Sequence, residues 1–369
     1  MDLLIKNIGS LYTLHPDEPY IEGRDNYALG FFDGKLVYQG PTSSSLDAKQ
    51  VIDGNGYIAL PGLIDAHTHT VFAGSRSTEF AKRLAGANYS TILEQGGGIH
   101  HTVKCTREAT LKELRRVALQ RMNIMKSHGV TTVEIKSGYG LSPQSEKKML
   151  EAISDPLPIR VLRTFLVHTI DSKYKSDRNA YIEQVLREQL PLCNPHVDAV
   201  DIYCDRGAFT LEESKEILQA AKEKYGLQIK AHAEQVEYTG IAKWVAENGG
   251  ISVDHLEQLP VDDIDALATN NCVATYLPGA QFYLKDPSPP TTELREAGVS
   301  IAVATDLNPG TSPLTNIWTA ATLSTLLQGL TMEEALLGIT RHAGKALGRN
   351  DLGWIGEGSV NDVILIKPP

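Results

Sequence analysis

The sequence predicts an α/β protein: a (β/α)8 TIM-like barrel with a small β-sandwich module built from both chain termini. Between residues 60 and 352, eight short apolar segments alternate with amphipathic ones. Each apolar segment is continuously hydrophobic, as strands of a parallel sheet buried on both faces are. Eight such repeats in succession favour a closed parallel barrel. The segments are GLIDAH, VTTVEIKS, IRVLRTFLV, VDAVDIYC, LQIKAH, ISVDH, CVATYL and VSIAVATD.

The intervening segments have the period of helices. In LKELRRVALQRMNIMKSHG an apolar residue recurs every three or four positions, which predicts one buried stripe formed by Leu111, Leu114, Ala118, Met122 and Met125. In TLEESKEILQAAKEKYG, Thr210 and Glu213 have the spacing of a capping box, which marks the start of a helix. A doubly wound open sheet is the alternative, but no Gly-rich phosphate loop follows an early strand.

The two ends of the chain have a different pattern. Short strand-like segments, LLIKNIGSLYTL, YALGFFDGKLVYQG and VIDGNGYIALPG, fill the start, and Asp33-Gly34 has the residue types of a hairpin turn. The tail DLGWIGEGSVNDVILIKPP again resembles a strand. We therefore expect residues 1–59 plus 353–369 to form the small β-module and residues 60–352 to form the barrel.

The charge of the chain excludes some classes of binding partner. The formal net charge of the 369 residues is −10, and no Lys/Arg-rich run occurs, so nucleic acid and anionic membrane surfaces are not expected partners. The four cysteines form no CxxC motif, no apolar run has the length of a membrane span, and Lys6 interrupts the short apolar stretch of the N-terminus. We expect a cytoplasmic protein with free thiols.

Polar residues gather where the predicted strands end, which is where barrel enzymes hold their chemistry. His67 and His69 follow the first strand on the same face, and His232 and Asp306 end the fifth and eighth strands. Three imidazoles and a carboxylate suit zinc or ferrous iron and leave a position open for water. His168 and His255 also lie at strand ends.

The segments PGLIDAHTH, HAEQ, VDHLE and ATDLNPG resemble the amidohydrolase superfamily. More narrowly, HTHTVFAGSR, TTVEIKSGYGL, YLPGAQFYL and TDLNPGTSP are similar to the imidazolonepropionase family of histidine degradation. The resemblance extends over nearly the whole chain. It implies hydrolysis of the ring C–N bond of 4-imidazolone-5-propanoate to N-formimidoyl-L-glutamate, and it suggests a homodimer.

The resemblance also implies roles for single residues. One divalent metal ion, Zn(2+) or Fe(2+/3+), would be bound by His67, His69, His232 and Asp306. Relatives with two metals carry a bridging lysine at the end of the fourth strand, where this chain has Cys204 and Asp205, so we expect one ion. Arg76 would bind the propionate of the substrate. A protein of net negative charge needs a local cation to bind an anionic ligand, and Arg76 would supply it. The remaining substrate contacts would come from Tyr139, His168, Asn308, Gly310 and Thr311.

The catalytic residues implied are Asp306, His255 and Gln235. Asp306 would accept the proton of the attacking water, and His255 would orient that water or stabilise the oxyanion. Gln235 stands where deaminases of the superfamily carry Glu; it can bind the ring but cannot relay a proton. A deaminase or formimidoylglutamate deiminase is the alternative function, which Gln235 disfavours. A non-catalytic barrel scaffold is a third, which the complete ligand set disfavours.

Overall fold

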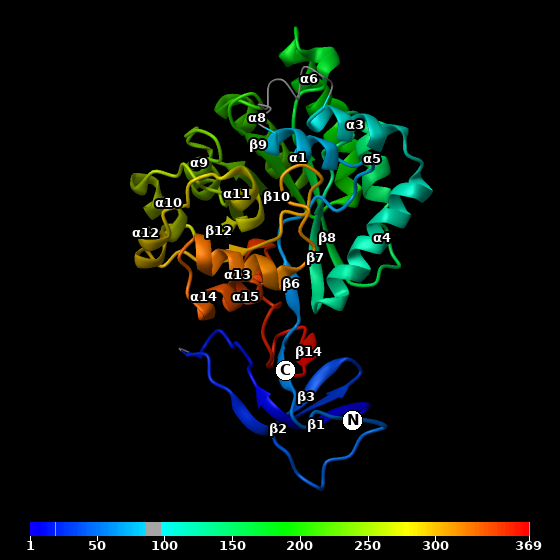
Figure 1. Ribbon diagram of the computed structural model, residues 1–369, viewed down its shortest axis with the longest axis vertical. Coiled ribbons are helices and arrows are strands. Elements are labelled where there is room, and N and C mark those ends of the chain that lie inside the picture. Colours follow the sequence, from blue (N-terminus) through cyan, green and yellow to red (C-terminus); the bar gives the residue numbers. More distant parts are fainter. Residues whose placement is uncertain (19, 86–96, 369) are drawn as a thin grey trace.

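The computed structural model describes residues 1–18, 20–85 and 97–368. Two sheets organise the chain: eight parallel strands, and six strands from the two termini. Figure 1 shows the parallel strands surrounded by helices, with the terminal sheet below them and both chain ends in that lower part. The predicted fold class is therefore confirmed.

All eight predicted barrel strands are present, in sequence order around the sheet. The first and last are not joined by a regular ladder; a bridge between Thr68 and Leu307 connects them. The Asp65 carboxylate reinforces this seam, because it accepts hydrogen bonds from the Thr305 amide (3.0 Å) and hydroxyl (2.6 Å). The strands are β6 (Leu63–Asp65), β7 (Val130–Lys136), β8 (Arg160–Val167), β9 (Ala199–Cys204), β10 (Gln228–Ala233), β11 (Ser252–His255), β12 (Val273–Tyr276) and β13 (Ile301–Val303).

Helices cover the outside of the barrel (Figure 1). In α4, four of the five predicted stripe residues are buried, but Leu111 is 41% exposed because it is the first helical residue, beside the Thr110 cap. The capping box predicted at Thr210 and Glu213 is present at the start of α8. The helices are α1 (Ser77–Leu84), α3 (Ile99–Glu108), α4 (Leu111–Ser127), α5 (Pro143–Glu151), α6 (Arg178–Gln184), α7 (Leu190–Cys193), α8 (Leu211–Tyr225), α9 (Ile241–Glu247), α10 (Ile264–Thr269), α11 (Pro278–Leu284), α12 (Thr291–Glu296), α13 (Ile317–Leu327), α14 (Met332–Gly338) and α15 (Arg341–Ala346).

The two ends of the chain share one mixed sheet, where the sequence suggested a sandwich. The C-terminal strand pairs antiparallel with β5, which joins the tail to the N-terminal strands as expected. The hairpin predicted at Asp33-Gly34 is present, with φ values of 49° and 71° at the two turn residues. The strands are β1 (Leu3–Leu11), β2 (Arg24–Phe32), β3 (Lys35–Pro41), β4 (Gln50–Asp53), β5 (Ile58–Pro61) and β14 (Val363–Ile366).

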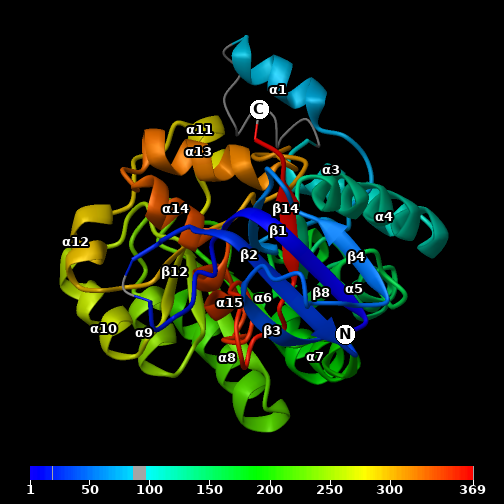
Figure 2. The same ribbon diagram turned by 90° about the horizontal axis from the view of Figure 1, so that it is seen from below.

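The terminal sheet lies at the end of the barrel where its strands begin. Viewed from below, β1, β2 and β14 cross in front of the barrel (Figure 2). The strands run away from this sheet, so their carboxyl ends open at the opposite end of the molecule (Figure 1). In the described part of the chain, no helix is long and apolar enough to cross a membrane.

Candidate metal centre and substrate cavity

Three histidines and one aspartate meet at the carboxyl ends of the barrel strands. The Nε2 atoms of His67 and His69 lie 3.3 Å apart. The Asp306 Oδ1 atom lies 3.5 Å from His67 Nε2 and 3.3 Å from His69 Nε2. His232 completes a set in which one ligand atom from each histidine lies within 4.8 Å of the others. The structure thus brings together the four residues that the sequence singled out as ligands.

Carboxylates on neighbouring strands orient two of these rings. Asp254 Oδ2 lies 2.7 Å from His67 Nδ1, and Asp201 accepts from His232 Nδ1 at 3.2 Å. A ring whose Nδ1 proton is held by a carboxylate leaves Nε2 free to bind a metal. Neither carboxylate was predicted from the sequence, although an acidic residue inside a strand buried on both faces was a signal for them.

The site has the donors and protonation state that a metal requires. His232 Nε2 is buried and makes no hydrogen bond in the described part of the chain. Burial lowers the pKa values of His67 and His69 well below the ordinary value, and nearby cationic groups add to this effect. Both rings are therefore neutral, the form that binds metal. A buried set of imidazoles with one carboxylate fits a zinc or iron ion.

A second group with ligand-like spacing lies deeper in the barrel and comprises His67, Glu134 and Asp254. Two ammonium groups already neutralise it. Lys136 Nζ lies 2.7 Å from Glu134, and Lys230 Nζ lies 2.9 Å from the other oxygen of that carboxylate. This deeper group is therefore an ion-pair network.

His255 lies at the end of β11 beside the ligand set. Its ring centroid is 5.5 Å from that of His232. Its φ of 87° is unusual for a residue with a side chain, and such strained backbone is concentrated at functional sites. Burial lowers the pKa of His255, but the negative charges of Glu257 and Asp306 outweigh it and raise the pKa. Glu257, whose Oε1 lies 3.6 Å from His255 Nδ1, was missed by the sequence analysis.

Tyr139 and His168 form an aromatic wall on one side of the ligands. His168 stacks on His69 with ring centroids 5.4 Å apart, and Tyr139 lies 5.3 Å from His168. Tyr139 is held by the loop after β7, whose amides at Gly138, Gly140 and Leu141 donate to the buried Glu146 carboxylate at 2.6–2.7 Å. Glu146 was not predicted from the sequence.

Arg76 reaches the turn that follows β13. A Cβ atom at Gly310 would lie 2.1 Å from Arg76 Nη1, so only glycine lets the guanidinium approach this closely. Arg76 Nε also pairs with Glu79 at 2.9 Å. The turn itself is shaped by Asn308, whose Oδ1 accepts from the amides of Gly310 (2.8 Å) and Thr311 (2.7 Å).

Gln235 lies in the loop after β10 and is partly buried. Two carboxylates shape this loop. Asp205 accepts from the amides of Gln235, Val236 and Glu237 at 2.7–3.2 Å. Glu234 accepts from the Gly240 and Ala242 amides at the start of α9, so its carboxylate is engaged with the backbone.

A cavity of about 740 Å³ opens beside this site. Arg76, Phe72 and Asn308 line it, together with apolar residues of α11 and α13. Arg121 also lines it, and two guanidinium groups on a mainly apolar wall are suited to a small ligand that carries an anionic group.

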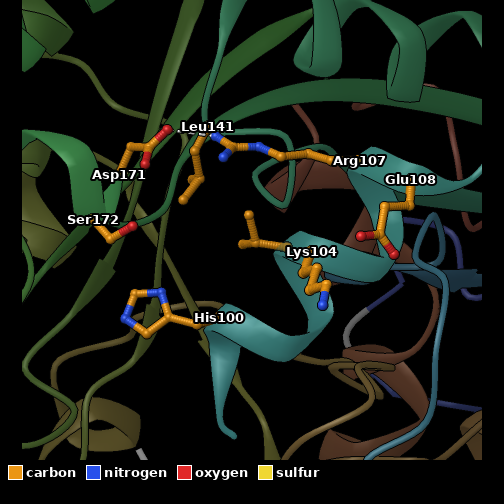
Figure 3. Close-up of a pocket in the computed structure, with 8 residues that line it drawn as sticks. His100, Lys104, Arg107, Glu108, Leu141, Asp171 and Ser172 are labelled. Atoms are coloured by element: carbon orange, nitrogen blue, oxygen red, sulfur yellow. Dashed lines mark hydrogen bonds and ion pairs between the residues drawn. The ribbon is translucent and has the colours of Figure 1, made fainter. Parts of the chain in front are cut away.

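A smaller cavity of about 270 Å³ lies between α3 and the loop after β8. In Figure 3, Arg107 extends toward Leu141 and Asp171, while His100 lies on the other side of the cavity. Arg107 donates to the Gly140 carbonyl and to Asp171, both at 2.6 Å, so it joins the loop that carries Tyr139 to the one after His168. His100 and His101 are partly buried in the first turn of α3.

Comparison with known proteins gives the class to which this fold and site belong. A model of the amidohydrolase family matches residues 58–369, so the chain belongs to that family. Within it, the chain belongs to the imidazolonepropionase family. Imidazolonepropionase of Idiomarina loihiensis is 43% identical over 90% of this chain and 83% of its own length. That of Caldanaerobacter subterraneus is 38% identical over 100% of this chain and 92% of its own.

Solved structures share the fold at lower identity. Atrazine chlorohydrolase from Arthrobacter aurescens, complexed with zinc, has a TM-score of 0.70 and 18% identity, over 99% of this chain and 87% of that one. An adenosine deaminase from Xanthomonas campestris, with bound zinc, has a TM-score of 0.67 and 17% identity, over 99% of this chain and 84% of that one.

Proposed function

We propose that this chain hydrolyses the ring C–N bond of 4-imidazolone-5-propanoate and releases N-formimidoyl-L-glutamate. The observation that carries the proposal is the buried set of His67, His69, His232 and Asp306 beside a cavity that Arg76 lines. Membership of the imidazolonepropionase family supports the substrate. The protein would act as a cytoplasmic homodimer.

The four residues would hold one zinc or iron ion. When bound, such an ion supplies Lewis acidity toward the ring carbonyl and lowers the pKa of water to near neutrality. Asp306 has its Oδ1 toward the imidazoles, while its Oδ2 accepts from Asn308 Nδ2 at 2.9 Å. We propose that Asp306 accepts the proton of the attacking water.

The other residues would bind and orient the substrate. His255 stands beside the ligands, where it can donate to the oxyanion that forms at the ring carbonyl. Tyr139 and His168 offer aromatic faces for the flat ring. Arg76 would bind the propionate, with Asn308, Gly310 and Thr311 shaping that end of the cavity. Gln235 would hydrogen-bond the ring.

The direct test is to incubate the purified protein with 4-imidazolone-5-propanoate and follow the loss of the ring's ultraviolet absorbance. We expect loss of absorbance with zinc or iron, none after chelation, and recovery when metal is restored. No ammonia should be released, because ring opening by water keeps every nitrogen in the product. Unchanged absorbance with metal-loaded protein would rule the proposal out, and ammonia release would favour the deaminase alternative.

Replacing Arg76 with Gln should abolish selection for an acidic tail. A charge-assisted pair of hydrogen bonds is worth about 1.5–3 kcal/mol. We therefore expect kcat/KM for imidazolone propionate to fall roughly 10- to 100-fold, mainly through KM. An imidazolone with an uncharged tail should be hydrolysed equally well by the variant and the parent. An equal loss on both substrates would show that Arg76 acts through its pairing with Glu79 instead.

A further inference from the structure

Five charged side chains fill the barrel directly beneath the metal ligands. Each is at most 1% exposed, and each is on a strand. Burying isolated charges is costly, so such a network persists only where its members neutralise and orient one another. Strand β7 contributes Glu134 and Lys136, β9 Asp201, β10 Lys230, and β11 Asp254.

One ammonium group joins the two carboxylates that hold the histidines. Lys136 Nζ lies 2.6 Å from Asp201 Oδ2 and 3.6 Å from Asp254 Oδ2. Asp201 holds Nδ1 of His232, and Asp254 holds Nδ1 of His67. The two histidines come from strands on different sides of the barrel. The Nζ atom of Lys136 joins the two carboxylates that hold them.

The backbone of Lys136 reaches the same centre. Its amide donates to the Thr68 carbonyl at 2.9 Å, between His67 and His69. Burial alone would lower the pKa of Lys136, but the charges of Asp201, Glu134 and Asp254 outweigh burial and raise the pKa. The side chain is therefore a permanent cation at the base of the site.

Lys230 provides a comparison within the same network. It is equally buried, and it lies 2.9 Å from Glu134 and 3.6 Å from Asp254. Among the ion pairs of the described residues, Asp201 pairs with Lys136 and His232 and not with Lys230. Removing either lysine takes one buried cation from the barrel, but only the loss of Lys136 frees the support of His232.

We propose that Lys136 is a positioning residue of the metal centre, which holds Asp201 and Asp254 so that His232 and His67 present Nε2 to the same point. Without this cation the two carboxylates repel each other. Apart from the imidazoles, the contacts left among the described residues are the His232 amide on Asp201, and the Ser252 hydroxyl and Lys230 on Asp254. The proposal rests on the proposed metal site. Partners that orient ligating histidines typically change metal affinity about 10- to 100-fold.

The test compares Lys136→Met with Lys230→Met in the full-length metal-free protein. Zinc affinity is measured by competition with a chromophoric chelator, and ring N–H protons of the histidines are observed by NMR. We expect Lys136→Met to weaken zinc binding roughly 10- to 100-fold and to lose the Nδ1–H signal of His232. Lys230→Met should keep that signal and weaken binding less than about five-fold, although both variants lose stability.

A third variant guards against simple misfolding. Lys136→Met combined with Asp201→Asn removes one buried charge of each sign, and with it the repulsion between Asp201 and Asp254, so it should bind zinc more tightly than Lys136→Met alone. Equal losses of zinc affinity in the two single lysine variants, or a double variant that binds zinc no better than Lys136→Met, would overturn the proposal. Parental protein that binds no zinc would instead refute the metal site itself, and the positioning role with it.

Discussion

Replacing Asp306 with Asn is expected to lower kcat about 1000-fold while leaving KM within a small factor. The change keeps the shape of the side chain, but its single oxygen can face either Asn308 or the imidazoles, and an amide cannot accept the proton of the attacking water. Positioned proton transfer contributes about 100- to 10,000-fold to enzymatic rates. The neutral amide is also a weaker metal ligand than a carboxylate, so metal content must be measured together with the rate.

A matched control is Asp263→Asn, which alters a buried carboxylate outside the site. Asp263 pairs with Tyr238 (2.8 Å) and Lys243 (3.6 Å). This variant should cost about 1 kcal/mol of stability and keep its rate. If metal-loaded Asp306→Asn retained more than a tenth of the parental kcat, another group would have to accept the proton.

Replacing Glu146 with Gln is expected to produce the largest loss of stability of any isosteric change in the loop region. The carboxylate accepts three backbone amides in the loop that carries Tyr139. Gln would place an amide NH2 against the Gly138 or Gly140 donors, so buried donors would face each other. We expect a loss of about 3 kcal/mol, or a fall of roughly 5 °C in Tm.

Glu151→Gln is the control, because it makes the same chemical change on the same helix, α5. Glu151 pairs with Lys147, and both side chains are about one-third exposed. Such a surface pair is worth less than about 1 kcal/mol. Thermal unfolding and kcat/KM should separate the two variants, with activity also falling in Glu146→Gln because Tyr139 loses its support. Equal Tm values for Glu146→Gln and Glu151→Gln would show that Glu146 does not hold the loop that carries Tyr139.

The clustering of the four proposed ligands could be predicted because each residue follows a strand in a pattern that is visible locally. His67 and His69 alternate along one strand end, and His232 and Asp306 occupy the corresponding places in later repeats. In a parallel barrel all such ends open on the same side, so the repeat order alone brings them together. The hairpin at Asp33-Gly34 and the cap at Thr210 were predictable for the same local reason.

The groups that orient the site were not predictable in this way. Glu146 is in a helix and showed no motif, yet its side chain turns back to the loop that precedes that helix.

Leu111 fitted the apolar period of its helix but lies at the exposed first turn. The spacing of apolar residues identifies which side of a helix is buried. It does not show how far along the helix the rest of the protein covers that side.

The sequence by itself determined the barrel and the common location of the three histidines and the aspartate, because these follow from short-range periodicity and the order of the repeats. Only the tertiary structure decided which carboxylate holds which imidazole. His67 and Asp254 are 187 residues apart, and Asp201 and Asp254 meet at Lys136 only because the curvature of the barrel turns their strands toward one interior. Side-chain pairing across a closed sheet depends on register and curvature, which no local pattern encodes.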